Sequence, residues 1–235
     1  MNILVIGGSG GIGSAMLQYL ISHYPNVKIF ATYRSTKPDK YRADVSWHHL
    51  DVENEASIQQ LAAHFEQLDW IINCVGLLHS QVSKPEKNLS SLSPEFFVQS
   101  MSVNCLATLL IAKHFQKIIR KSDRPCLATV SAKVGSITDN QLGGWYSYRA
   151  SKAALNMALK SIAIEWGRLM PKSVVVALHP GTTNTQLSRP FQANVPEGKL
   201  FSPHYTAEQL IEILLSLKPS DSGSFIAYDG ERLPW

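Results

Sequence analysis

The sequence of 235 residues is poor in cysteine, with only Cys74, Cys105 and Cys126, and these three share no metal-ligand spacing. An odd, widely spaced set argues against a disulfide framework and favours reduced thiols in a cytoplasmic protein. Charged residues make up 17% of the chain and hydrophobic residues 45%, which excludes intrinsic disorder. A chain of this length can form a core without disulfide or metal support, so we expect one domain over residues 1–235.

The sequence also lacks a strong charge of either sign and a long apolar run. Its 22 Lys and Arg against 18 Asp and Glu leave a net charge of +4. The densest basic segment, residues 113–124, is typical of cations near a helix C-terminus rather than of a nucleic-acid stripe. No run reaches the ~18 apolar residues of a membrane span. Residues 1–6 have no basic segment of the signal-peptide kind. We therefore expect no nucleic-acid partner, no membrane partner and a cytoplasmic location.

Two kinds of apolar pattern alternate along the chain. Short apolar and β-branched runs predict buried strands, and stripes with helical spacing predict helices between them. The predicted strands cover residues 3–6, 27–33, a segment before residue 51, and residues 70–73, 126–131, 174–178 and 224–228. This order predicts an α/β fold, a single doubly wound (Rossmann) parallel sheet of about seven strands with helices on both faces.

Some segments carry more specific predictions. The apolar pattern of residues 97–118 predicts one helix, and residues 146–169 predict a long one. Residues 206–209, Thr-Ala-Glu-Gln, fit a capping box that opens the last helix. Residues 182–203 show no clear period. Because long irregular loops in compact domains are usually lids or binding loops, we interpret this segment as the substrate-binding loop.

Five of the fourteen glycines lie between Gly7 and Gly13, where the first predicted strand meets the first predicted helix. A helix N-terminus binds phosphate through its free N–H groups, and glycine lets the backbone approach a pyrophosphate. A triphosphate-binding P-loop is disfavoured, because Ser14 and Ala15 stand where that loop requires Lys and then Ser or Thr. The segment predicts a dinucleotide-binding site.

Acidic residues are absent between Val27 and Pro38, around the end of the second predicted strand. Enzymes that use NAD generally place an acid here to accept a hydrogen bond from the ribose 2′-hydroxyl. Arg34 can instead pair with the 2′-phosphate of NADP. The sequence therefore favours NADP, with NAD as the alternative cofactor and a solvated surface arginine as the alternative interpretation of Arg34.

Tyr148 and Lys152 are four residues apart in a predicted helix, so they share one face. The pairing has a chemical reason, because a nearby cation favours the phenolate of a tyrosine that is otherwise a weak acid. Tyr146 is the competing candidate, but it lies roughly 240° around the helix from Lys152. Ser131 ends a predicted strand at the edge where ligands bind, and its hydroxyl can hold a substrate carbonyl or cap a helix.

The motifs together resemble those of the short-chain dehydrogenase/reductase family over nearly the whole chain. The spacing Gly7-x-x-x-Gly11-x-Gly13 is similar to the family's glycine loop, although Ile6 replaces the usual Thr. Residues 144–156 and 228–235 resemble the C-factor and sniffer-type carbonyl reductase branch. The resemblance implies a catalytic tetrad of Asn104, Ser131, Tyr148 and Lys152, in which Asn104 supports a water-linked proton relay. It also implies a homodimer or homotetramer formed through the long helix, with Met157 and Trp166 at the interface.

The resemblance further implies how the cofactor is held. Asp51 and the Val52 backbone would lie beside the adenine, Asn73 would support the sheet, and Thr185 would hold the carboxamide. The full predicted set of cofactor-binding residues is Gly7, Ser9, Gly11, Ile12, Gly13, Arg34, Asp51, Val52, Asn73, Gly76, Tyr148, Lys152, Pro180, Gly181, Thr182, Thr183 and Thr185.

The implied function is an NADP-preferring oxidoreductase that moves hydride between nicotinamide and a small carbonyl or alcohol substrate, without a metal. Tyr148 would act as the acid/base. The alternative on the same fold is an NAD(P)-binding signalling protein of the C-factor type with little or no turnover.

Overall fold

The computed structural model describes residues 1–39 and 44–235. Seven parallel strands form one sheet in the order β3-β2-β1-β4-β5-β6-β9. The strands are β1 (Asn2–Ile6), β2 (Lys28–Tyr33), β3 (Val45–His49), β4 (Trp70–Asn73), β5 (Cys126–Val130), β6 (Val174–His179) and β9 (Ser224–Ala227). The predicted fold class is confirmed. The strand order reverses between β1 and β4, which places a ligand crevice beyond their carboxyl ends.

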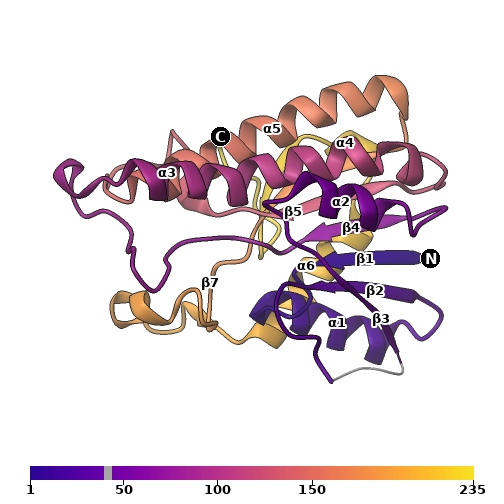
Figure 1. The fold of residues 1–235 in the computed structure, drawn as a ribbon, viewed down its shortest axis with the longest axis horizontal. Helices are drawn as coiled ribbons and strands as arrows, with labels where there is room; N and C mark the ends of the chain where they lie inside the picture. The colour runs from indigo at the N-terminus through magenta and orange to yellow at the C-terminus, as the bar shows by residue number, and fades with distance from the viewer. Residues whose placement is uncertain (40–43) are drawn as a thin grey trace.

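Helices cover both faces of the sheet (Figure 1). One face carries α1 (Gly11–His23) and α6 (Pro203–Ser216), and the other carries α2 (Glu55–Ala62), α3 (Pro94–Met101), α4 (Ala107–Ile119) and α5 (Tyr146–Leu169). Alternate residues of β1 enter different cores: Ile3 and Val5 pack towards α1, and Leu4 and Ile6 pack towards α4 and α5. Because both faces are buried, the strand is apolar throughout rather than alternating.

Two helix predictions need correction. The segment expected to form one helix is divided by a π-helical turn at Ser102–Leu106 between α3 and α4. Helix α6 begins at Pro203 rather than at the expected capping box, because the Ser202 side chain accepts a hydrogen bond from the Tyr205 N–H at 3.1 Å. Proline suits the first helical position, since it has no N–H to satisfy. Thr206 lies inside the helix and is buried.

The continuous helical run Pro94–Ile119 is long and apolar enough to cross a membrane, with a mean hydropathy of 1.4. Half of this window is buried against the rest of the protein. Core helices of folded domains have the same composition. Its apolar character is therefore explained by packing on the sheet and on α5.

Helix α5 has the bounds predicted from the sequence, but its two expected interface residues separate. Met157 is 68% exposed, whereas Trp166 is buried in the core. The expectation that Trp166 lies at an interface was therefore wrong, because the indole faces the sheet.

Two long connections extend beyond the carboxyl ends of the strands, at the left of Figure 1. One joins β4 to α3. The other, predicted as an irregular loop over residues 182–203, is partly regular: β7 (Thr182–Thr183) pairs with β8 (Leu200–Phe201), and a 3₁₀ helix spans Arg189–Asn194. Residues 74–78 of the first connection and several residues between 182 and 195 of the second line one cleft.

Candidate active site

A cleft of about 880 Å³ opens at the carboxyl ends of the central strands. Most of the residues predicted for the cofactor and for catalysis line it: Gly7, Ser9, Gly11, Ile12, Arg34, Val52, Gly76, Ser131, Tyr148, Lys152, Pro180, Gly181, Thr182, Thr183 and Thr185. Among the residues that the structure describes, Gly13, Asp51, Asn73 and Asn104 lie outside this lining. The sheet thus brings segments from the whole length of the chain to one place.

The glycine loop is packed too tightly for side chains. A Cβ added to Gly13 would lie 2.3 Å from the Gly7 carbonyl oxygen, so α1 can approach the loop only with glycine there. A Cβ on Gly11 would lie 2.5 Å from Thr185 Cγ2, which places the Thr185 side chain directly against the loop. The arrangement fits a dinucleotide, whose pyrophosphate needs an open, backbone-lined cradle at a helix N-terminus.

A hydroxyl from the neighbouring strand supports this loop. The Gly7 N–H donates a hydrogen bond to Thr32 Oγ1 at 2.9 Å. Thr32 is buried in β2. This contact supplies a hydroxyl to a loop that has Ile6 where the family usually has threonine. Sequence reasoning did not identify Thr32, and its only signal was a polar residue inside a predicted buried strand.

Asn73 and Asp51 form hydrogen bonds with neighbouring groups of the protein. The Asn73 amide donates to Thr108 Oγ1 at 3.0 Å, and its oxygen accepts the Val75 N–H at 3.0 Å, so it anchors the end of β4. Asp51 accepts the Glu53 N–H at 3.1 Å and closes a turn.

Arg34 lies at the outer end of the cleft, just beyond β2. Its guanidinium donates to Glu53 Oε2 at 3.1 Å, and its side chain is 67% exposed. An exposed ion pair of this kind adds little stability. Arg34 can therefore exchange Glu53 for an anionic group at small cost, which suits an arginine that binds phosphate.

Tyr148 and Lys152 are both buried on the cleft side of α5. Lys152 Nζ lies 5.8 Å from the centroid of the Tyr148 ring and donates to the Val130 carbonyl at 3.0 Å. That bond uses one of the three donors of an ammonium group. The other two are available to hydroxyl groups of a ligand in the cleft.

Burial dominates the electrostatics of this pair. Desolvation lowers the pKa of Lys152 to about 8 and raises the pKa of Tyr148 well above its usual value. Tyr148 is therefore a protonated phenol near neutral pH, the state required to donate a proton.

The remaining tetrad residues have defined partners. Ser131 Oγ donates to Asn156 Oδ1 at 2.7 Å, and this contact joins β5 to α5. Asn104, in the π-helical turn, accepts the Leu77 N–H at 2.7 Å and donates to Ser151 Oγ at 2.9 Å. Asn104 thus ties the loop after β4 to α5. π-helical turns are frequent at functional sites, but their presence could not be read from the apolar spacing.

Part of the cleft lining is apolar and aromatic. Leu78, Val103, Leu187, Phe191 and Val195 contribute to its lining. His179 also lines it, and burial, with Lys133 nearby, lowers the pKa of its imidazole to about 4. A neutral His179 at the end of β6 accepts the Lys133 N–H at 3.3 Å, so it links β6 to the segment that follows β5. Among the described residues, no group of three or more His, Cys, Asp or Glu could hold a metal.

A family model described as short chain dehydrogenase matches residues 1–196. The chain belongs to the short chain dehydrogenase family. This confirms the resemblance, and with it an oxidoreductase that uses a nicotinamide cofactor. A curated relative, 1-hydroxy-2-glutathionyl-2-methyl-3-butene dehydrogenase of Rhodococcus sp. (strain AD45), is 27% identical over 240 residues and aligns over 99% of each chain. C-signal of Myxococcus xanthus is 33% identical over 138 residues, covering 58% of this chain and 77% of that protein.

Solved structures share the fold. The carbonyl reductase Sniffer of D. melanogaster superposes with a TM-score of 0.87 at 21% identity, covering 100% of this chain and 99% of the other. An NADPH-bound carbonyl reductase from chicken fatty liver has the same TM-score at 24% identity, covering 100% and 98%.

Proposed function

We propose that this short chain dehydrogenase is an NADPH-preferring carbonyl reductase. The observation that carries the proposal is the buried pair Tyr148 and Lys152, which faces the same cleft as the glycine loop. Burying an ammonium is costly, and a protein that only bound a nucleotide would need no such pair. The preference for NADPH is supported by Arg34, which stands where enzymes that use NAD generally place an acid.

When bound, the nicotinamide supplies the hydride that reduces the carbonyl carbon. The Tyr148 hydroxyl donates its proton to the carbonyl oxygen as a general acid. The Ser131 hydroxyl turns from Asn156 to this oxygen and stabilises its developing charge. Lys152 Nζ holds the ribose hydroxyls and stabilises the phenolate that remains after proton transfer. Asn104 keeps the loop after β4 in place and supports the return of a proton to Tyr148.

The substrate of this reaction is an at least partly apolar carbonyl compound or alcohol. Leu187, Phe191 and Val195, all on the connection after β6, present apolar surface to the cleft. A pocket wall of this kind gains binding free energy from apolar burial rather than from charge.

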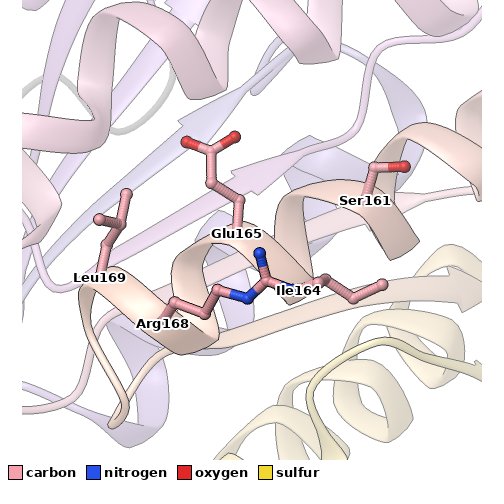
Figure 2. Close-up of a pocket in the computed structure, with 5 residues that line it drawn as sticks. All are labelled: Ser161, Ile164, Glu165, Arg168 and Leu169. Carbon is pink, nitrogen blue, oxygen red and sulfur yellow. The ribbon is translucent and has the colours of Figure 1, made fainter.

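The chain forms a homodimer or homotetramer through α4 and α5, in the cytoplasm. Leu109, Met157, Ile164 and Leu169 are exposed on these helices. Figure 2 shows Ile164 and Leu169 with Ser161, Glu165 and Arg168 along one exposed side of α5, where they line an open hollow. Exposed apolar side chains gathered on one face are typical of an association surface. The cytoplasmic location is in keeping with the unpaired thiols of the three described cysteines.

The proposal is tested by NADPH oxidation with a panel of aromatic and aliphatic aldehydes and ketones, together with fluorescence titrations of NADPH and NADH. We expect turnover of apolar carbonyls and tighter binding of NADPH. Tight NADPH binding without turnover of any carbonyl or alcohol would contradict the reductase proposal. That result would favour a signalling role, for which the partial similarity to C-signal is the supporting observation.

A further inference from the structure

The connection between β4 and α3 contacts the start of α5 through one buried acid, Glu86, which is 2% exposed. Its carboxylate accepts the Ser147 N–H at 3.2 Å and, in a short hydrogen bond, the Ser147 hydroxyl. Its main-chain oxygen accepts the Trp145 N–H at 2.6 Å. A buried carboxylate is tolerated only with such hydrogen bonds. All of these partners lie within three residues of Tyr148.

Glu86 does for α5 what the helix's own N-cap cannot. Helix N-caps are usually Ser, Thr, Asp or Asn, whose side chains accept a free N–H of the first turn. Here the N-cap is Trp145, and in the described chain its side chain caps no N–H. Glu86, 61 positions before Ser147, supplies the missing oxygen. A negative charge at this end also suits the helix dipole. The first turn of α5, which includes Tyr148, is therefore held by a distant loop.

Trp145 itself has an unusual backbone. Among residues 1–39 and 44–235 it is the only non-glycine residue with a positive φ, at 51° with ψ 43°. A bulky residue in this left-handed region is strained, and such strain persists only where surrounding contacts enforce it. The hydrogen bond to the Glu86 carbonyl is one of these contacts. Strained residues of this kind concentrate at functional sites.

In this conformation the indole lies in the cleft lining, beside Tyr148 and Phe191. The Trp145 ring centroid lies 6.2 Å from that of Tyr148 and 5.0 Å from that of Phe191. Phe191 in turn lies 5.8 Å from the His79 ring. These spacings are those of contacting aromatic rings. The indole therefore contacts both the proposed general acid, Tyr148, and Phe191 on the connection after β6.

We propose that Trp145 is a specificity-determining residue for substrates that carry a flat apolar ring beside the carbonyl, and that Glu86 is the positioning residue that holds it. The inference rests on the proposed carbonyl reduction. Glu86 is not among the residues that line the cleft. It acts through Trp145 and the first turn of α5, so its loss changes substrate choice rather than cofactor binding.

The experiment compares kcat/KM for an aromatic ketone and a small aliphatic ketone in the intact protein, with NADPH titrated for each variant. In Glu86→Ala we expect the aromatic-to-aliphatic ratio of kcat/KM to fall at least about tenfold, because small misplacements near the reacting groups cost large factors. The Kd for NADPH stays within about twofold, since no cofactor contact changes. Glu86→Gln restores most of the ratio, because its amide can accept the Ser147 N–H and donate to Ser147 Oγ.

Asp69 provides a matched control. Its carboxylate also accepts one backbone N–H, from Asn2 at 2.7 Å, and one serine hydroxyl, from Ser122, but at the amino ends of the central strands. Asp69→Ala is expected to lower thermal stability and leave the ratio of kcat/KM unchanged. Equal effects of Glu86→Ala and Asp69→Ala on the ratio would overturn the proposal.

A coupled variant tests whether Glu86 acts through Trp145. Glycine adopts a positive φ without strain, so Trp145→Gly should fold even without the contacts from Glu86. It should also lose the preference for aromatic substrates. Glu86→Ala should then change the ratio little further in the Trp145→Gly background. An equal drop in both backgrounds would overturn the proposal. If Glu86→Ala fails to fold, Ser147→Ala removes the hydroxyl contact alone and should shift the ratio in the same direction.

The wild type separates the two proposals. If it reduces no carbonyl in the panel, both the proposed function and this inference fail. If it reduces carbonyls but Glu86→Ala keeps the wild-type ratio, only the inference fails.

Discussion

Helix α5 has opposite character at its two ends. Its first three turns bury polar groups, with Ser151, Lys152 and Asn156 each no more than 3% exposed. Its last turns expose apolar groups, with Ile164 at 52% and Leu169 at 44% (Figure 2). Both patterns cost stability in an isolated subunit, since buried polar groups lose hydration and exposed apolar groups order water. Chemistry in the cleft explains the first cost, and the proposed association would explain the second.

The strongest test of the buried end is Tyr148→Phe, which removes one oxygen and leaves the ring. We expect carbonyl reduction to fall by about 10²–10⁴-fold, the range typical of a lost general acid. NADPH affinity and thermal stability should be retained, because the phenyl ring still fills the same space. The assay is NADPH oxidation with an accepted carbonyl, alongside NADPH titration. Tyr146→Phe, on the exposed side of the same turn, is the control and should keep full activity. Full turnover by Tyr148→Phe would refute the mechanism.

Lys152→Met tests whether burial of Lys152 in the first turns of α5 lowers the stability of the folded protein. The pKa of Lys152 is lowered from 10.5 to about 8 by burial, so the charged form is disfavoured in the folded protein. Replacing it with an apolar side chain of similar length should raise the free energy of unfolding at pH 7 by up to about 3 kcal/mol, while reduction is lost.

The stability difference between Lys152→Met and the wild type should depend on pH in a defined direction. Between pH 8 and 10.5 the unfolded wild type binds more protons at this lysine than the folded protein does, so wild-type stability rises with pH. The advantage of Lys152→Met should therefore shrink across this interval in denaturant titrations. Lys160→Met is the matched control, since Lys160 also donates to a carbonyl, that of Gly223, but is exposed. A destabilised Lys152→Met at pH 7 would contradict the prediction.

Arg34→Ala tests an exposed cation of the cleft, in contrast to the buried Lys152. Loss of a charge-assisted contact to the 2′-phosphate should weaken NADPH binding by about 1.5–3 kcal/mol and leave NADH binding unchanged. Fluorescence titration of both cofactors measures the difference, with Arg120→Ala, at the end of α4, as the control. Equal affinities of the wild type for the two cofactors, or no loss in Arg34→Ala, would show that Arg34 is only a surface residue.

Ile164→Glu tests the exposed end and should have the smallest effect on chemistry. A charge placed in an apolar interface is costly to desolvate, so the oligomer should dissociate in light scattering while activity per subunit changes little. Val82→Glu, at a residue that is 94% exposed on the loop after β4, should leave the oligomer intact. A wild type that is already monomeric at micromolar concentration would remove the association explanation.

Patterns that depend on nearby residues were predictable. The strand Trp70–Asn73 and the helix Tyr146–Leu169 have the bounds that their residues suggested, since apolar period and β-branched content are local properties. The start of α6 was predicted wrongly because two segments offered caps, and Ser202 followed by proline prevailed over Thr206. The π-helical turn at Asn104 left no mark in the apolar spacing.

The sequence by itself determined the order of strands and helices, the glycine loop and the common face of Tyr148 and Lys152. Each follows from spacings of a few residues. Only the tertiary structure decided that Thr32 supports Gly7, that Asn156 holds Ser131 and that Glu86 caps α5, contacts that join residues 25, 25 and 61 positions apart. Many polar residues could have made such contacts. Which of them meet depends on the path of the whole chain, because hydrogen bonds act only over about 3 Å.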